Sequence, residues 1–346
     1  ATNDAGIDKH GKQTDRFMAG VEIHARHTVL AEGCHGSLTK KLIAQFDLRK
    51  HSDPQSYGLG IKEIWEIPSA QHKPGSIVHT IGWPMDFKTY GGGWIYHYGT
   101  NLVSIGYVVG LDYTNPTLSP FEEMQRWKHH PAIAEHLKGG RRISYGARSL
   151  VEGGIQSVPN LTVPGALLVG DAAGFLNVPK IKGNHTAMQS GMLAAEALVD
   201  MLGKDTAEIR CTSYAKRLRA SWVWDELYKV RNIRPGFHFG LFIGLVLAAI
   251  DTYIFHGRAP WTLRQHADYK QTKHLDEVRP IVYPKPDGVL SFDRLSSVYL
   301  SNTNHAEDQP AHLKLRDPDL AIAVNLDLFG SPETKYCPAG VYEIVR

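Results

Sequence analysis

The chain has 346 residues, of which 42% are hydrophobic, and its 38 Lys and Arg residues against 35 Asp and Glu give a formal net charge of +3. This length and apolar content suffice for more than one hydrophobic core, so we expect a globular protein of two or three units. The mild charge, without a dense Lys/Arg run, argues against a nucleic-acid partner. The three cysteines, Cys34, Cys211 and Cys337, are far apart, which argues against a disulfide framework and favours free thiols in a reducing compartment.

The amino-terminal region shows half of a possible dinucleotide site. We expect a polar hairpin over residues 4–15 and a strand over 20–31, followed by a G-x-x-G turn at Gly33 and Gly36 and then a helix. This pattern is weak alone. No G-x-G-x-x-G motif follows an amino-terminal strand, so the pyrophosphate-binding βαβ unit is missing and the chain is expected to begin within a longer protein.

Residues 57–111 are rich in β-branched and aromatic residues and are interrupted by Gly and Pro, which predicts an antiparallel sheet with strands near 77–81, 94–98 and 102–109. The run Tyr90-Gly91-Gly92-Gly93-Trp94 leaves backbone groups uncovered beside aromatic rings, where a flat carbonyl ligand could bind. A hairpin turn or a β-bulge is the other interpretation.

A helix is expected to follow this sheet. Ser119, Pro120 and Glu122 form a capping-box pattern, and the helix that they start should end before residues 139–140.

Residues 166–185 are the most informative stretch. A short apolar strand delivers Asp171 to its carboxyl end, where a carboxylate can accept hydrogen bonds from the sugar-alcohol hydroxyls of a dinucleotide. Gly170 and Gly174 permit close backbone approach. A helix over 184–202 would direct its amino-terminal N–H groups at phosphate or at flavin oxygens. An ordinary strand, loop and helix, with Asp171 capping a turn, is the alternative.

The most apolar segment, residues 237–250, is followed by Asp251 and is too short to span a bilayer. Basic residues before it, such as Arg231 and Arg234, and aromatic residues after it suit a helix that lies in a membrane interface. A buried core helix explains the apolar run equally well.

A cysteine stands in a Pro/Gly loop near the carboxyl terminus. Iron–sulfur ligands are often placed in such loops, but a cluster needs about four of them. This chain cannot assemble a cluster from its own thiols, and a structural role for Cys337 is the simpler interpretation of the residue alone.

Six strings resemble, in the same order, the electron transfer flavoprotein–ubiquinone oxidoreductase family, and they extend over nearly the whole chain. They are AEGCHG from Ala31, TYGG from Thr89, NVPKIKG from Asn177, APWTL from Ala259, DQPAHL from Asp308 and CPAGVYE from Cys337. The resemblance implies an α/β and α+β protein with three domains. These are a partial FAD-binding Rossmann-like domain (1–56 and 150–222), an inserted antiparallel-sheet domain that binds ubiquinone and contacts the membrane (57–149 and 223–288), and a partial ferredoxin-like 4Fe–4S domain (289–346).

The resemblance also implies the activity of electron-transferring-flavoprotein dehydrogenase, an oxidoreductase of electron transport. Such an enzyme takes electrons from reduced electron transfer flavoprotein and passes them, through FAD and a 4Fe–4S cluster, to ubiquinone. It thereby links fatty-acid and amino-acid oxidation to the respiratory chain. The implied location is the mitochondrial inner membrane, or the bacterial plasma membrane for a prokaryotic source, on a monotopic membrane surface.

Site residues follow from the resemblance by position. Gly91 and Gly92 would contact the quinone head group, residues 237–255 would embed the quinone entrance, and Cys337 would be the first of four cluster ligands, with Thr334 nearby. No proton-donating side chain is assigned. The implied FAD-binding residues are Gly33, Gly36, Gly170, Asp171, Gly174, Lys182, Gly183, Asn184 and His185.

The chain also departs from the family pattern. Besides the missing amino-terminal motif, it stops before the Cys-x-x-Cys-x-x-Cys run that completes a cluster, and Asn184 stands where Thr or Ser is expected. The polypeptide is therefore expected to be an inactive fragment of an active parent protein. The alternatives are an FAD-dependent hydroxylase or geranylgeranyl-reductase-like flavoenzyme, and a fragment that only associates with membranes.

Overall fold

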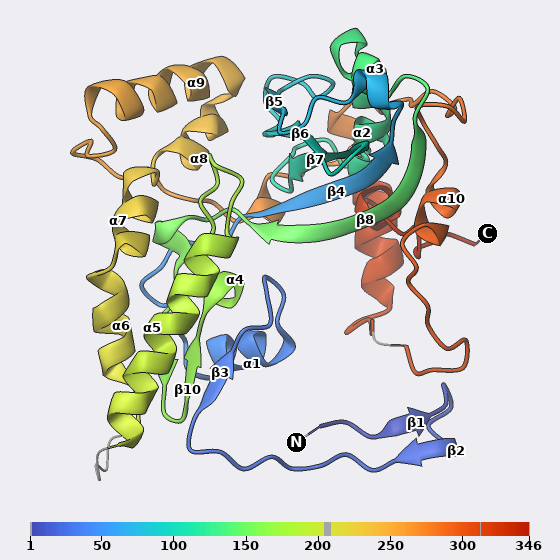
Figure 1. The fold of residues 1–346 in the computed structure, drawn as a ribbon. Coiled ribbons are helices and arrows are strands. Elements are labelled where there is room, and N and C mark those ends of the chain that lie inside the picture. Colours follow the sequence, from blue (N-terminus) through green and yellow to red (C-terminus); the bar gives the residue numbers. More distant parts are fainter. Residues whose placement is uncertain (1, 204–208, 312, 346) are drawn as a thin grey trace.

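The computed structural model describes residues 2–203, 209–311 and 313–345, which form three β-sheets and the helices that join them (Figure 1). A small sheet with its helices lies beside a large antiparallel sheet, and a carboxyl-terminal segment packs near the last strand of the large sheet. The expected combination of α/β and α+β units is confirmed.

The small sheet has parallel and antiparallel pairs. Its elements are β3 (Thr28–Leu30), α1 (Ser37–Gln45), β9 (Thr162–Val163), β10 (Ala166–Leu168), α4 (Gly170–Ala173), α5 (Asn184–Leu202), α6 (Thr212–Arg219) and α7 (Trp222–Lys229). β10 lies between the other strands, parallel to β3 and antiparallel to β9. Side chains of α5, α6 and α7 share one hydrophobic core with Leu30 and Leu167. The predicted strand over 20–31 is only three residues long, because β10 offers β3 a partner of that length.

The large sheet confirms the predicted antiparallel region. Its strands are β4 (Tyr57–Glu66), β5 (Ile77–Ile81), β6 (Gly91–Tyr98), β7 (Leu102–Gly110) and β8 (Arg141–Val151). Their order is β5-β6-β7-β4-β8, and β4 pairs along its whole length with both β7 and β8. Ile61, Trp65 and Ile105 are fully buried in the core of this sheet.

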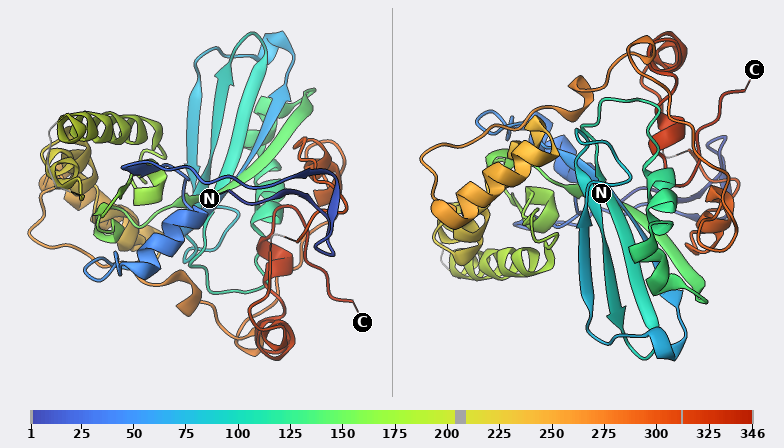
Figure 2. Two further views of the ribbon diagram at one scale, coloured as in Figure 1. Left: turned by 90° about the horizontal axis from the view of Figure 1, so that it is seen from below. Right: turned by 90° about the horizontal axis from the view of Figure 1, so that it is seen from above.

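Two helices, α2 (Pro120–Lys128) and α3 (Pro131–Leu137), lie against one face of the large sheet (Figure 2). Ser119 Oγ accepts a hydrogen bond from Glu122 N, as the capping pattern predicts. The prediction of a single helix up to 138 is wrong. Pro131 lacks an N–H and disfavours the helical conformation at His130, so the first helix ends and a second begins.

The remaining elements are short. They are β1 (Ala5–Ile7), β2 (Gln13–Met18), η1 (Ser69–Gln71), η2 (Ile155–Ser157), α8 (Ile233–Gly236), η3 (Phe237–Phe239), α9 (Leu241–Ala249), η4 (Ile250–Ile254), η5 (Asp268–Lys270), η6 (Leu275–Glu277), α10 (Arg294–Tyr299), η7 (Ala321–Leu326), α11 (Asp327–Phe329) and α12 (Glu333–Tyr336). β1 and β2 are antiparallel, which confirms the amino-terminal hairpin.

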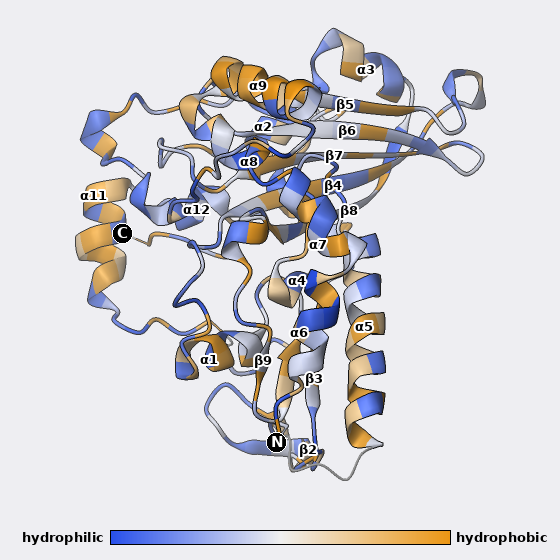
Figure 3. Cartoon of the chain, turned by 90° about the vertical axis from the view of Figure 1, so that its left-hand side faces the viewer, coloured by the Kyte–Doolittle hydropathy of each residue, from blue (hydrophilic) through white to orange (hydrophobic). Residues whose placement is uncertain are grey.

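Helix α9 is apolar and largely exposed (Figure 3). Phe242 and Val246 are 65% and 58% exposed, and Gly244 is the only residue of the helix that is buried. The interpretation as a buried core helix is therefore wrong. Within the described residues, no helix is both long and apolar enough to cross a bilayer.

The basic residues before α9 are not positioned as expected for a helix that lies in a membrane interface. Arg231 and Arg234 are buried, and neither extends to the surface. Arg231 donates to the carbonyl oxygens of Gly257, Ala259 and Trp261, and so fixes the chain that returns from η4.

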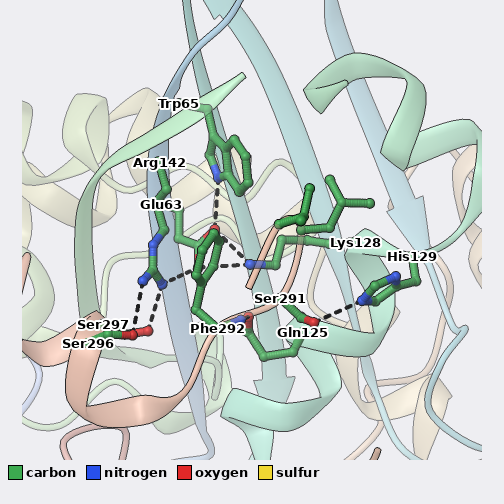
Figure 4. A network of polar contacts seen from close by, with 12 residues as sticks. Glu63, Trp65, Gln125, Lys128, His129, Arg142, Ser291, Phe292, Ser296 and Ser297 are labelled. Atoms are coloured by element: carbon green, nitrogen blue, oxygen red, sulfur yellow. Dashed lines mark hydrogen bonds and ion pairs between the residues drawn. The ribbon is translucent and has the colours of Figure 1, made fainter. Parts of the chain in front are cut away.

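A buried ion cluster joins the large sheet to the carboxyl-terminal segment (Figure 4). Glu63 of β4 accepts hydrogen bonds from Lys128 Nζ (3.0 Å) and Arg142 Nη1 (3.2 Å), and all three side chains are almost completely buried. Arg142 also donates to Ser297 Oγ (2.6 Å) and lies against the ring of Phe292. One carboxylate thus holds two cations and, through Arg142, the segment that contains α10.

Glu63→Gln should destabilise the protein by about 3–5 kcal/mol, because two buried cations would lose their carboxylate. The measurement is the free energy of unfolding from chemical denaturation. Glu66→Gln is the matched control on the same strand, since Glu66 pairs with Arg141 at the surface and its loss should change little. Equal effects of the two variants would contradict this account of the ion cluster.

Candidate functional site

A cavity of about 560 Å³ lies between the large sheet and the loop that precedes α5. The sheet side includes Ile77, His79, Thr80, Ile81, Gly91, Gly92, Tyr96, Val108 and Leu150. The loop side consists of Leu176, Val178, Pro179, Lys180, Ile181 and Lys182. The structure therefore brings the predicted quinone contacts and one predicted flavin contact, Lys182, into the same cavity.

Gly91 and Gly92 are the first two residues of β6, and both pair with β7; Gly91 has a φ of +155°. Gly92 lies opposite Ile81 of β5 and Val108 of β7, without a bulge, so the interpretation as a turn or bulge is wrong. A Cβ atom on Gly92 would overlap the carbonyl oxygen of Thr80. The absence of side chains thus permits close strand packing and also keeps this part of the cavity wall free of side chains.

The cavity mouth is bridged by a hydrogen-bonded chain of three side chains. Lys182 Nζ donates to Tyr96 Oη (2.7 Å), and Tyr96 Oη lies 3.3 Å from His79 Nε2. Burial first, and the charge of Lys182 second, lower the pKa of His79. This chain ties the loop to the sheet across the cavity.

The loop is fixed from behind by Glu226 of α7. Its carboxylate accepts hydrogen bonds from Asn177 Nδ2 (2.9 Å), Lys180 Nζ (3.0 Å) and His185 Nε2 (2.7 Å). Partial burial acts to raise the pKa of Glu226, but the three hydrogen bonds prevail and lower it to about 2. His185, which also stacks on Trp222, therefore faces α7 and does not line the cavity.

Asp171 lies where the strand β10 ends, within α4, which is followed by Gly174 in a left-handed conformation (φ +96°). Its Oδ1 atom is buried and has no hydrogen-bond partner among the described residues. A Cβ atom on Gly183 would stand 3.4 Å from this oxygen, so the carboxylate lies near the amino terminus of α5. Burial raises the pKa of Asp171, opposed by Arg148.

The amino terminus of α5 is not capped by a side chain. Gly183 is its N-cap, and Asn184 is its exposed first residue. Free N–H groups beside an unpartnered carboxylate oxygen suit a ligand that carries both hydroxyl groups and electron-rich oxygens. The predicted FAD half-site therefore has the chemistry that such a ligand needs.

The turn at Gly33 and Gly36 has an evident structural purpose. Glu32 accepts hydrogen bonds from Leu38 N and Thr39 N, and so caps α1. A Cβ atom on Gly36 would clash with the Glu32 side chain. Binding of a dinucleotide by this turn stays a prediction.

A second buried ion cluster lies beside the cavity and is not evident in the sequence. Arg234 donates to Glu152 Oε2 (2.9 Å) and Asp112 Oδ1 (2.8 Å) and packs on the ring of Tyr90, 4.3 Å from its centroid. Glu152 and Tyr90 both line the cavity. The only sequence feature that could have indicated this cluster is Glu152, directly after β8. An acidic residue at such a position is common in loops and does not by itself predict an ion pair.

Cys337 is buried in the loop after α12. In the described part of the chain, no three His, Cys, Asp or Glu side chains gather as a metal site, so these residues alone do not fit a 4Fe–4S cluster. Thr334 Oγ1 donates to Ser331 O within its own turn. Ligation by Cys337 stays a prediction.

Two parts of the chain match models of known protein families. Residues 57–150 match the family model described as "ETF-QO, ubiquinone-binding", and residues 288–346 match "Electron transfer flavoprotein-ubiquinone oxidoreductase, 4Fe-4S". The mitochondrial electron transfer flavoprotein-ubiquinone oxidoreductases of Sus scrofa and Homo sapiens are each 53% identical over 355 aligned residues, which include the whole chain. The chain is therefore similar to proteins of this family along its whole length.

The chain spans 58% of the length of these two relatives. The Arabidopsis thaliana protein of the same name is 51% identical, and the chain spans 55% of it. Among solved structures, a geranylgeranyl bacteriochlorophyll reductase-like protein of Thermoplasma acidophilum is 16% identical, with 66% of this chain and 60% of that chain covered and a TM-score of 0.47.

The pKa of Glu226 predicts a pH dependence of stability. Because the folded pKa is about 2 and the ordinary value is 4.5, ionised Glu226 stabilises the protein fully above about pH 5, and this contribution falls as the pH drops towards 2. Glu226→Gln should therefore reduce the free energy of unfolding at pH 7 by about 2–3 kcal/mol and flatten its decline in acid. Chemical denaturation at a series of pH values measures this.

Glu196→Gln is the control, since Glu196 is exposed on α5 and pairs with Arg217 at the surface. A Glu226→Gln variant with the same acid profile as the wild type would show that the carboxylate does not stabilise the loop.

Proposed function

We propose that the intact protein to which this chain belongs transfers electrons from reduced electron transfer flavoprotein to ubiquinone. The observation that carries the proposal is the shared cavity, in which the glycines of β6 face the loop that leads into α5. A quinone head group in this cavity would lie beside the predicted flavin half-site. The 53% identity to proteins named electron transfer flavoprotein-ubiquinone oxidoreductase supports the same activity.

Three cofactors or substrates belong to the proposal: FAD, ubiquinone and a 4Fe–4S cluster. For FAD, the proposed contacts at the second half of the site are Gly170, Asp171, Gly174, Lys182 and Gly183, with Asn184 and His185 at the start of α5. FAD, when bound, supplies the electron-accepting chemistry, and the chain's own groups orient it. The described residues supply one ligand, Cys337, for a cluster, so no step is derived through that group.

Apolar residues connect the cavity to α9. A small neighbouring void shares Ile81, Tyr90 and Gly91 with the cavity and is also lined by Phe237 and Leu241. The rings of Phe87 and Phe242 pack together 5.0 Å apart at this place. We propose that α9 and its neighbours rest on a membrane surface and admit the quinone tail there.

The proposal also divides the chain into three domains. Residues 1–56 and 150–222 would bind FAD, 57–149 and 223–288 would bind ubiquinone and contact the membrane, and 289–346 would form part of the 4Fe–4S domain. The relatives named above are mitochondrial. We propose the mitochondrial inner membrane as the location, with the bacterial plasma membrane as the alternative for a prokaryotic source.

Leu150→Trp tests the quinone cavity. Leu150 lines it from β8, and a tryptophan there should occupy part of its volume and weaken binding of a short-chain ubiquinone analogue at least about tenfold, or about 1.4 kcal/mol. Ile143→Trp, on the same strand but outside the cavity, is the control. Titration of the intact protein gives the affinity, and ubiquinol formation with reduced electron transfer flavoprotein gives the activity. No ubiquinol from the wild type would refute the proposed function.

The double variant Phe242→Glu, Val246→Glu tests the membrane surface. Burying each native side chain in a bilayer interface is worth about 1.5–3 kcal/mol, so binding to phosphatidylcholine vesicles should fall more than about tenfold. Vesicle flotation measures this. Val282→Glu, at another exposed apolar residue, should bind as the wild type does. If all three proteins float equally, α9 is not the contact.

A further inference from the structure

One buried acid faces the proposed quinone cavity. Among the described residues that line this cavity, Glu152 is the only carboxylic acid, and it is 3% exposed. It directly follows β8, and its backbone N–H donates to Ser56 O (2.7 Å), which fixes its place at the end of the sheet. A carboxyl group at this position has the chemistry of a proton donor.

The two oxygens of Glu152 are not equivalent. Oε2 accepts the hydrogen bond from Arg234 Nε, whereas no donor among the described residues reaches Oε1. A Cβ atom on Gly58 would overlap Oε1, so the glycine leaves room for this oxygen. One oxygen is therefore anchored and the other remains available to a ligand or to water.

Other charged and titratable groups surround Glu152 on several elements. They are Arg234 on α8, Asp112 after β7, Tyr90 before β6, His238 on η3 and Asp268 on η5. Burial raises the pKa of Glu152, the charge and hydrogen bond of Arg234 lower it, and the charge of Asp112 raises it again. The net direction is upward, so the carboxyl group keeps its proton to higher pH than an ordinary glutamate.

We propose that Glu152 donates a proton to the quinone oxygen when ubiquinone is reduced in this cavity, and that Arg234 is the residue that positions it. The inference rests on the function proposed above. Reduction of one quinone to a quinol takes two electrons, which reduced electron transfer flavoprotein supplies, and two protons. The O–H bond of the Glu152 carboxyl breaks as an O–H bond of the quinol forms.

The carboxylate that remains is stabilised by Arg234 until a proton from bulk solvent, passed on by water, restores the carboxyl group. The second proton comes from water at the cavity mouth, where the chain of Lys182, Tyr96 and His79 contacts solvent. Because the guanidinium of Arg234 does not release a proton in this pH range, Arg234 holds Glu152 and does not relay protons.

The experiment uses Glu152→Gln and Glu152→Asp in the intact holoprotein, with reduced electron transfer flavoprotein as the donor and two alternative acceptors. Short-chain ubiquinone needs protons, whereas ferrocenium accepts an electron without one. Glu152→Gln should reduce the quinone rate about 10²-fold and leave the ferrocenium rate unchanged, and Glu152→Asp should keep part of the quinone rate. The wild-type quinone rate should fall as pH rises through the carboxyl pKa, and Glu152→Gln should lose this dependence.

Asp112→Asn is the matched control, because it removes the other partner of Arg234 but leaves the cavity acid in place. Loss of the Asp112 charge should shift the alkaline fall of the quinone rate to lower pH without abolishing it. An infrared pH titration of the unloaded chain gives a readout independent of turnover. In the wild type, a protonated-carboxyl band should persist to higher pH than an ordinary glutamate allows, and Glu152→Gln should lack this band.

Two results would overturn the inference. One is a Glu152→Gln variant with the wild-type quinone rate and pH profile. The other is an equal loss with both acceptors, which would indicate a structural role alone. A wild type that reduces ferrocenium but not ubiquinone would instead refute the proposed function, and the inference with it.

Discussion

The contact of the Glu63 carboxylate with two buried cationic side chains is the interaction on which the arrangement of this protein most depends. Glu63 lies on β4, which pairs with strands on both sides, and it forms ion pairs with one cation from α2 and another from β8. Burial of two cations is tolerated only because a carboxylate and hydroxyl groups satisfy them. The same arginine contacts α10, so the carboxyl-terminal segment takes its position from a charge inside the sheet.

Local sequence patterns predicted the parts of the site that are local. A short apolar strand, an acidic residue and a glycine predicted the position of Asp171, and small residues at helical spacing predicted the bounds of α5. Runs of β-branched and aromatic residues, interrupted by Gly and Pro, predicted the antiparallel sheet. The division between α2 and α3 also had a local signal, Pro131, which the expectation of one continuous helix overlooked.

Contacts between distant residues had no such signal. Arg234 precedes an apolar helix and suggests a cation at a membrane surface, yet its partners are Glu152 and Asp112, which are 82 and 122 residues away. Neither the hydrophobic periodicity nor the spacing of motifs indicates a contact between residues that lie so far apart in the sequence. Likewise, no pattern in the sequence indicated that His185 hydrogen-bonds to Glu226 on α7, 41 residues away. Its expected contact with the flavin stays a prediction.

Glu226 has a consequence for the electron transfer proposed above. Its carboxylate binds one side chain at each end of the loop and one within it, so the wall that separates the proposed flavin and quinone positions is held by three hydrogen bonds. Polar groups that are fixed in advance need little movement when charge changes beside them. In the proposed function, a frame held in this way would keep the reorganisation energy of each electron transfer low, because the loop would not have to move as the charge moves beside it.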